Sequence, residues 1–345
     1  MNKENNLIIL GIESSCDETA AALVQKRGSI FKILSSVVSS QIEIHKKYGG
    51  VVPEVAARNH ILNIIPVIDQ ALVEAKVKPG QIDKIAVTTG PGLITSLLIG
   101  VETAKTLAYT WQKPICSINH LKAHLYANWL SNQPIKFPAL ALIVSGGHTE
   151  LILMKNEKSL KKIGQTLDDA AGEAFDKVAQ LLNIGYPGGP IISQLAKKGN
   201  TQAFNFARPM INSSDFNFSF SGLKTSVLYT IQKLRVQSSE FRAANSKLKA
   251  DLCASFQQAA VDVLVAKTFK AAKYYQAKTV MLSGGVAANS LLRESLKLKA
   301  QSLKLNFLMP NINLCTDNAA MIAAAATFEK PTPWQKLRVD PNLEI

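Results

Sequence analysis

Two of the five histidines, His120 and His124, lie four residues apart in the segment INHLKAHLYAN, residues 118–128. On a helix this spacing places both imidazoles on one face, about one turn apart. Neutral imidazole is the commonest metal ligand in proteins, so the pair is a candidate for two ligands of one ion. Two surface histidines without any ligand would have the same spacing, and the pair alone does not decide between these interpretations.

The residues around the pair argue against a peptidase. Zinc peptidases of the HExxH kind carry a glutamate directly after the first histidine as general base, and Leu121 takes that position here. A third ligand would come from another segment, and the candidate is Asp317 in CTDNAAMIAA. Asp317 stands where a helix is expected to begin, so N-capping is its alternative role. Two histidines and one carboxylate would leave coordination positions open for a substrate.

Three Gly-Gly turns form a second group of candidate site residues, in VSGGHTE (144–150), YPGGP (186–190) and SGGVAAN (283–289). Paired glycines let the backbone approach a ligand closely, and a helix N-terminus that follows favours phosphate. Each could be a plain tight turn, because none has a Walker or GxGxxG pattern. Together they favour a nucleotide cleft. The acidic segment 167–180 could reach sugar hydroxyls or form a solvated helix face.

The segments that must position these residues alternate between strands and helices. Strands are expected within 6–14, 28–40 and 82–92, and helices at 53–77 and 93–111. The strand–turn–strand opening of residues 6–25 is repeated at 137–156. This alternation indicates the α/β class with a largely buried sheet, and the two openings predict two similar lobes with a cleft between them.

Composition narrows the class of protein and its partners. The segment 93–111 has Glu102 and Lys105 in its middle and is therefore no lipid span. Four scattered cysteines without a CxxC pair predict a reduced, cytoplasmic protein. Residues 1–116 hold 12 Lys and Arg against 10 Asp and Glu, whereas residues 117–345 hold 27 against 15. This asymmetry favours a polyanion such as nucleic acid over a membrane, although solvated helix faces would explain any single basic run.

Taken in order, nine motifs resemble the TsaD family, whose members transfer a threonylcarbamoyl group to N6 of adenosine 37 in tRNA. The resemblance runs from residue 8 to about residue 325. Its motifs are GIESSCDETAAAL, GPGLITSLLIGVETAKTLA, INHLKAHLYA, LIVSGGHTEL, LDDAAGEAFDKVAQLL, YPGGP, FSFSGLKT, SGGVAAN and TDNAAMIA.

The resemblance implies an actin/Hsp70/sugar-kinase-like (ASKHA) fold with two similar α/β lobes around a nucleotide cleft. The expected N-terminal lobe is 1–116 with a C-terminal strap of about 325–345, and the C-terminal lobe is 117–324 with a helical insertion at about 166–270. The resemblance also implies that His120, His124 and Asp317 bind one divalent metal, Fe²⁺ with Zn²⁺ as the alternative. The residues expected to bind threonylcarbamoyl-AMP are Ile143, Val144, Ser145, Gly146, Gly147, Asp176, Gly189 and Asn289.

The implied reaction forms t6A in tRNAs that read ANN codons and releases AMP. Asp176 is expected on the ribose hydroxyls and the 284–289 turn near the adenine. The catalytic group is unknown, with Glu13 as a guess for the residue nearest the reacting centre. Residues 155–162 and 233–249 are candidate tRNA contacts. The implied protein partners are a TsaB-like paralogue and a TsaE-like ATPase. Binding to a membrane is not expected.

Two rival activities remain for such a chain. A metalloprotease would need a general base beside the metal. A small-molecule kinase of the same fold would transfer the γ-phosphate of ATP without any tRNA. The histidine pair and the basic second part both count against the kinase.

Overall fold

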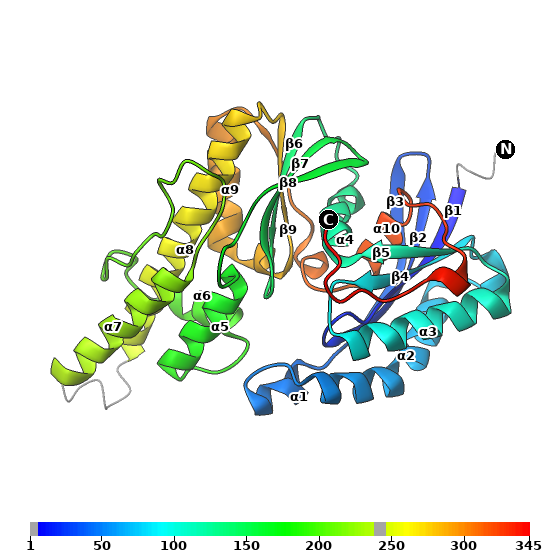
Figure 1. Ribbon diagram of the computed structural model, residues 1–345, viewed down its shortest axis with the longest axis horizontal. Coiled ribbons are helices and arrows are strands. Elements are labelled where there is room, and N and C mark those ends of the chain that lie inside the picture. The colour runs from blue at the N-terminus through cyan, green and yellow to red at the C-terminus, as the bar shows by residue number, and fades with distance from the viewer. Residues whose placement is uncertain (1–5, 238–245) are drawn as a thin grey trace. The chain divides into compact units, whose positions relative to one another are not determined.

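The computed structural model of the protein describes residues 6–237 and 246–345 (Figure 1). The chain forms two compact units: Met1–Pro134 with Pro310–Ile345, here unit 1, and Ile135–Met309, here unit 2. Unit 2 is therefore inserted into unit 1 in chain order. A first boundary at residue 116, as the sequence predicts, leaves the histidine pair in the second lobe. In the structure, the pair lies in unit 1, because its helix follows a strand of the unit 1 sheet directly.

Unit 1 contains a five-stranded mixed sheet in the order β3-β2-β1-β4-β5. β1, β2 and β3 are antiparallel, whereas β4 and β5 run parallel to β1. Helices cover both faces, which explains why β1 and β4 are nearly continuous apolar runs. The strands are β1 (Asn6–Glu13), β2 (Glu18–Arg27), β3 (Ile30–Ser40), β4 (Lys84–Gly90) and β5 (Ile115–Asn119). The helices are α1 (Ile42–His45), α2 (Pro53–Ala75), α3 (Ile94–Trp111), α4 (His120–Tyr126) and α10 (Ala319–Ala325).

Alternate residues of β1 face different helices. Leu10 and Ile12 belong to the buried core that α2 and α3 form with the sheet. Gly11 points to the other face, where a Cβ atom would meet the carbonyl oxygen of Ala319 and lie 2.9 Å from the nitrogen of Ala323. The missing side chain of Gly11 thus lets α10 lie directly on the sheet, and α10 fixes the position of Asp317 just before it.

Replacing Gly11 with alanine is expected to destabilise unit 1 by about 3 kcal/mol, the upper end of overpacking costs. The added methyl group meets backbone atoms of α10, which have no rotamer to change. Chemical denaturation of the variant and of Gly80→Ala, whose Cβ would meet nothing within 4 Å, measures this cost. An unchanged unfolding midpoint for Gly11→Ala would contradict the close packing of α10 on Gly11 of β1.

Unit 2 repeats the strand order of unit 1. Its sheet runs β10-β9-β6-β7-β8, with β6, β7 and β8 antiparallel and with β9 and β10 parallel to β6. The prediction of two similar α/β lobes is therefore confirmed. The strands are β6 (Ala139–Val144), β7 (Thr149–Asn156), β8 (Ser159–Gln165), β9 (Thr279–Ser283) and β10 (Asn306–Leu308).

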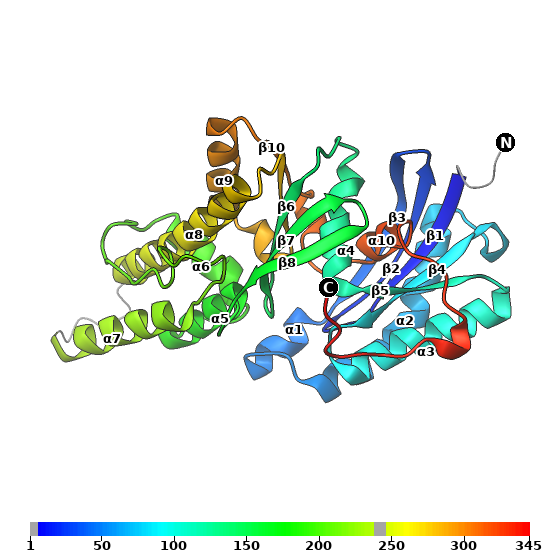
Figure 2. The same cartoon turned by 45° about the horizontal axis from the view of Figure 1, so that its top comes forward.

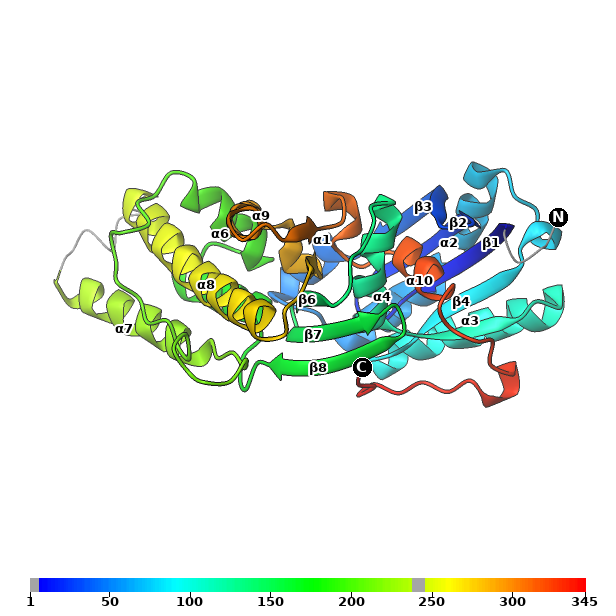
Figure 3. The same ribbon diagram turned by 90° about the horizontal axis from the view of Figure 1, so that it is seen from above.

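The remaining helices of unit 2 are grouped around its longest one, α8. Figure 3 shows α8 with α6 and α9 beside it, and both pack against it. The helices are α5 (Ala171–Leu182), α6 (Gly188–Ala196), α7 (Ser221–Gln237), α8 (Ser246–Tyr274) and α9 (Ser290–Ser302).

The segment after α10 belongs to unit 1 and follows β5 and α3, as Figure 2 shows. Thr332 donates a hydrogen bond from its backbone nitrogen to Ile115, and Asp340 donates one to Thr89. Asn119 donates from Nδ2 to the carbonyl oxygens of Leu343 and Glu344. The segment therefore lies along β5 and reaches the end of β4. Within the described residues, no helix has the length and apolar character needed to cross a membrane.

Candidate functional site

Polar residues of unit 1 gather where three strands end. β1 ends at Glu13, β4 carries Thr88 near its end, and β5 ends at Asn119. Because these strands are parallel, their carboxyl ends meet at one edge of the sheet, where α/β sheets place ligands. The side chain of Asn119 accepts a hydrogen bond from the backbone of Lys122 and caps α4. This cap fixes the start of the helix that carries the histidine pair.

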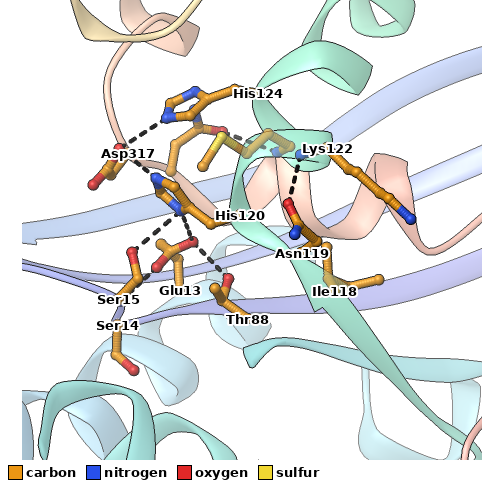
Figure 4. A network of polar contacts seen from close by, with 12 residues as sticks. Glu13, Ser14, Ser15, Thr88, Ile118, Asn119, His120, Lys122, His124 and Asp317 are labelled. Carbon is orange, nitrogen blue, oxygen red and sulfur yellow. Dashed lines mark hydrogen bonds and ion pairs between the residues drawn. The ribbon is translucent and has the colours of Figure 1, made fainter. Parts of the chain in front are cut away.

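His120, His124 and Asp317 form a compact cluster, in which both histidines are buried (Figure 4). Nε2 of His124 lies 3.1 Å from Oδ1 of Asp317, and Nε2 of His120 lies 3.4 Å from the same oxygen. The two rings are 4.6 Å apart, with their planes at 82°. The N-cap of α10 is the neighbouring Asn318, whose side chain accepts from Met321. Asp317 therefore does not cap the helix, and its carboxylate faces the histidines.

Burial and charge give the two histidines different protonation. Burial disfavours the imidazolium ion and lowers the pKa of His124, although its hydrogen bond to Asp317 acts in the other direction. Burial also acts on His120, but the carboxylates of Asp317 and Glu13 outweigh it and raise the pKa of His120 well above its ordinary value. Burial would raise the pKa of Asp317, yet the two histidines hold it well below its usual range. Asp317 is thus ionised and His124 neutral, the forms in which they bind metals.

Glu13 contacts His120 on the side of the ring that faces away from Asp317. It is fully buried, and its Oε2 lies 3.1 Å from Nδ1 of His120. Oε1 accepts from the backbone nitrogen of Ser15 at 2.6 Å, and Oε2 accepts from Thr88 at 2.6 Å. Burial would raise the pKa of Glu13, but His120 outweighs this effect and lowers it. This placement favours a positioning role for Glu13, because its oxygens are occupied by protein groups.

Sequence reasoning missed Ser15 and Thr88. Ser15 Oγ lies 3.2 Å from Nδ1 of His120, and Thr88 contacts Glu13 from the neighbouring strand. One signal was available for Thr88: a polar residue near the carboxyl end of a strand lies at the edge where ligands bind. Ser15 is part of the first turn, and nothing in its sequence context separates it from Ser14.

The donor atoms of the cluster fit one metal ion. One ligand atom from each of His120, His124 and Asp317 lies within 4.8 Å of the other two. Nδ1 of His120 is turned away toward Glu13, the carboxylate–histidine arrangement that orients metal ligands. Nδ1 of His124 is buried without a hydrogen-bond partner among the described residues. Two imidazoles and a carboxylate occur at iron(II) and at zinc sites, so the donor set does not distinguish these metals.

Replacing Glu13 with glutamine is expected to weaken metal affinity about 10- to 100-fold. In glutamine, an NH2 group replaces one of the two carboxylate oxygens. This group would face the backbone N–H of Ser15 or Nδ1–H of His120, so two donors would point at each other and one hydrogen bond would be lost. Titration of the metal-free protein with Fe²⁺ or Zn²⁺ against a competing chelator measures the affinity. Glu43→Gln, at a side chain with 83% exposure, is the matched control. Equal affinities in the two variants would show that Glu13 does not orient His120.

In unit 2, two of the glycine turns meet α5. Gly172, near the start of α5, donates from its nitrogen to the carbonyl oxygen of Ser145 at 3.2 Å. Gly188, the first residue of α6, donates to Oδ1 of Asp176 at 2.7 Å. Burial raises the pKa of Asp176, and the backbone donors of Gly188 and Gly189 act against this. The turns after β6 and before α6 are therefore both held on α5.

The third glycine turn joins the same group. A Cβ atom on Gly284 would strike the backbone of Val144. The side chain of Asn289 caps α9 by accepting a hydrogen bond from the backbone nitrogen of Leu292. Its Nδ2 donates to Oε1 of Gln257 at 2.8 Å. The structure thus brings the 144–147 turn, Asp176, the PGGP turn and the SGGVAAN turn together in one part of unit 2.

The residues predicted to bind threonylcarbamoyl-AMP differ in whether their side chain or only their backbone can contact a ligand. The side chains of Ile143 and Val144 are fully buried, so only their backbone is available. Gly146 and Gly147 are exposed, and a Cβ atom on Gly146, Gly147 or Gly189 would meet nothing within 4 Å. This open space lets a ligand approach the backbone of these turns.

Of the two candidate tRNA-binding segments, the structure describes the first completely and the second only in part. Residues 155–162 form the β7–β8 hairpin, in which Lys155, Lys158 and Lys161 are exposed. In the range 233–249, residues 238–245 lie outside the described part of the chain. The flanking residues belong to α7 and α8.

Comparison with known proteins gives a consistent family. Residues 32–324 match the family model described as "TsaD: tRNA N6-adenosine threonylcarbamoyltransferase". The enzyme of that name from Thermosipho melanesiensis is 53% identical over 341 residues, which cover 98% of this chain and 100% of the relative. The Listeria welshimeri enzyme is 52% identical over 326 residues, covering 94% and 92%.

Solved structures with low sequence identity support the fold alone. Component A of (R)-2-hydroxyglutaryl-CoA dehydratase from Acidaminococcus fermentans aligns with a TM-score of 0.51 and 14% identity, over 96% of this chain and 99% of that one. Full-length HypF aligns with a TM-score of 0.59 and 15% identity over 95% of this chain. The present chain spans 47% of HypF.

Proposed function

The chain belongs to the TsaD family of tRNA N6-adenosine threonylcarbamoyltransferases, and from this premise we propose which of its residues hold the donor, the metal and the protein partners. The family activity is the formation of t6A in tRNA by threonylcarbamoyl transfer. The observation that supports the assignment of residues is the gathering of the three glycine turns around α5 in unit 2.

The donor is threonylcarbamoyl-AMP, and the acceptor is N6 of adenosine 37 in tRNAs that read ANN codons. N6 attacks the carbamoyl carbon, the bond from this carbon to the phosphate oxygen breaks, and AMP leaves with the electron pair. The amine gives its proton to solvent. An anticodon loop presents such a base outside a regular duplex, so positioning carries more of the rate than a strong base does.

The donor lies against the turn after β6. The exposed backbone of Gly146 and Gly147 lines its threonylcarbamoyl group, with Ser145 and the backbone of Ile143 and Val144 beside it. Oδ1 of Asp176 already accepts from Gly188, but a carboxylate has about four acceptor sites. The sites that remain accept the ribose hydroxyls. Gly189 and Asn289 contact the same nucleotide, with the 284–289 turn near the adenine.

His120, His124 and Asp317 hold one divalent metal, Fe²⁺ with Zn²⁺ as the alternative. Such an ion supplies Lewis-acid stabilisation of negative charge on oxygen. The chain's own contribution is to orient the ligands. Glu13 holds Nδ1 of His120, and the seat of α10 on β1 holds Asp317.

The protein acts in the cytoplasm with a TsaB-like paralogue and a TsaE-like ATPase. None of its four cysteines forms a disulfide within the described residues, which is the usual state in a reducing compartment. Ile61, Leu62 and Ile65 of α2 are 63%, 72% and 57% exposed. Such an apolar patch is typical of a protein–protein contact and supports a partner on this helix.

The test is a transfer assay with purified protein, threonylcarbamoyl-AMP and unmodified tRNA, with and without bacterial partner proteins. Nucleosides from the digested tRNA are analysed by mass spectrometry. Threonylcarbamoyl-adenosine is the expected product, and a tRNA with guanosine at position 37 is the control. No product even with the partners present would contradict the assignment.

A further inference from the structure

An aromatic cavity lies at the C-terminal end of α8, away from the glycine turns in sequence. It has a volume of about 520 Å³ and is lined by Ser214, Phe216, Lys270, Lys273, Tyr274 and Tyr275. We call these six residues the Tyr274 surface. The ring centroids of Phe216 and Tyr274 are 5.5 Å apart, and those of Tyr274 and Tyr275 are 4.9 Å apart. Tyr274 is 72% exposed, so its ring is open to a ligand.

Two lysines of α8 fix the loop that forms the other wall of this cavity. Lys267 is fully buried, and its ammonium group donates to Ser213 and to the side chain and carbonyl oxygen of Asp215. Lys270 donates to the carbonyl oxygens of Ser213 and Ser214 and lies 6.0 Å from the ring centroid of Phe216. The loop that carries Phe216 is thus held in place before any ligand binds, which reduces the entropy cost of binding.

The chain segment that supplies four of the six lining residues is strongly basic. Residues 263–309 hold eight Lys and Arg and one acidic residue, Glu294. A second groove of about 710 Å³ shares Lys270 and Lys273 with the first and adds Lys299 of α9. Neither groove is lined by an acidic residue. The carboxylate of Asp215, in the loop that Lys267 fixes, is paired with the buried ammonium of Lys267.

Exposed rings beside lysines are the means by which proteins bind unpaired nucleotides: bases stack on the rings, and phosphates lie against the cations. A protein partner with an acidic surface could use both the lysines and the ring, since tyrosine is enriched at protein interfaces, and direct binding of tRNA with its salt dependence separates the two. We propose that the Tyr274 surface binds the tRNA substrate away from the nucleoside that is modified. An unpaired base stacks on Tyr274, and the adjoining phosphates lie on Lys273 and Lys299. This inference rests on the tRNA activity of the family.

The test is equilibrium binding of an unmodified tRNA, by fluorescence anisotropy over a series of salt concentrations. Tyr274→Ala is expected to weaken binding by about fivefold or more, because stacking one base contributes roughly 1–3 kcal/mol. Tyr274→Phe keeps the ring and should retain the affinity. Lys273→Gln should reduce the slope of log affinity against log salt by about one.

The chain offers a matched control in Lys47 and Tyr48, an adjacent pair with Tyr48 61% exposed. Lys47→Gln and Tyr48→Ala should leave tRNA affinity and salt slope unchanged. Thermal unfolding of every variant shows that its fold is intact, as expected for exposed positions. Wild-type affinity in both Tyr274→Ala and Lys273→Gln would overturn the proposal.

The transfer assay separates this proposal from the proposed function. In steady-state kinetics, Tyr274→Ala should raise the KM for tRNA and leave the KM for threonylcarbamoyl-AMP unchanged. If the wild-type protein forms product but Tyr274→Ala shows the wild-type KM for tRNA, the surface assignment alone is wrong. If the wild-type protein forms no product with its partners, the assignment of function is wrong, and the binding data still decide whether the surface holds RNA.

Discussion

Replacing His124 with alanine is expected to remove the metal and to lower the rate of threonylcarbamoyl transfer by more than about 100-fold. Even the outer partners of metal ligands cost 10- to 100-fold when they are changed, and His124 is placed as a direct ligand. Its side chain is 1% exposed, and its Nε2 points to Asp317, so water cannot easily replace the lost nitrogen. Metal content by plasma mass spectrometry and product by nucleoside analysis measure the two effects.

The control for this prediction is the binding of AMP. The residues proposed to bind the nucleotide all belong to unit 2, whereas His124 belongs to unit 1. His124→Ala should therefore bind AMP with the affinity of the wild-type protein, which also shows that unit 2 is folded. His60→Gln changes another buried histidine, one that contacts Thr19 and Cys16, and should keep the metal. Full metal content in His124→Ala would contradict the cluster as a metal site.

Replacing Gly172 with alanine is expected to have the opposite pattern: it should abolish most of the transfer activity and leave the metal in place. The added Cβ atom would lie 2.5 Å from the carbonyl oxygen of Ser145 and 2.8 Å from Cα of Gly146. Both neighbours are backbone, so the turn that is proposed to line the threonylcarbamoyl group must move. A misplacement of about 1 Å can cost 100-fold in rate.

The measurements for Gly172→Ala are the KM for threonylcarbamoyl-AMP, the rate of transfer and the metal content. Gly50→Ala is the matched control, since a Cβ atom there would meet nothing within 4 Å. An overpacked core costs about 1–3 kcal/mol, so a fall in the unfolding temperature is expected as well. A fully active Gly172→Ala protein would show that the position of the Ser145 turn does not limit the reaction.

The sequence predicts the site best where the residue types and their local spacing indicate the same role. The spacing of His120 and His124 predicts a shared helix face, and Asp317 is the carboxylate that the structure places beside them. The other partners of this cluster depend on strand order. Thr88 reaches Glu13 because β4 is the neighbour of β1, and a single sequence does not determine which strands pair. For the same reason the close contact of Gly172 with Ser145 is visible only in the structure.

The repeated strand–turn–strand openings predict two similar lobes, and both sheets have the same strand order. The extent of each unit is harder to predict, because it depends on contacts made across the whole chain. Residues 117–119 end β5, and α4 follows directly and packs with α10, which returns from far along the chain. The segment after α10 hydrogen-bonds to β4 and β5, a contact that no local pattern indicates.

Unit 2 leaves unit 1 after Pro134 and returns to it at Pro310, and the three candidate ligands lie close to these two crossing points. His120 and His124 precede the exit, and Asp317 follows the return. A bound ion would therefore act as a cross-link that closes the chain around the entire inserted unit. Cross-links across long loops remove the most freedom from an unfolded chain, so the ion would stabilise unit 1 by holding its two chain segments together. Metal supply would then govern how much of the protein is folded as well as how fast it works.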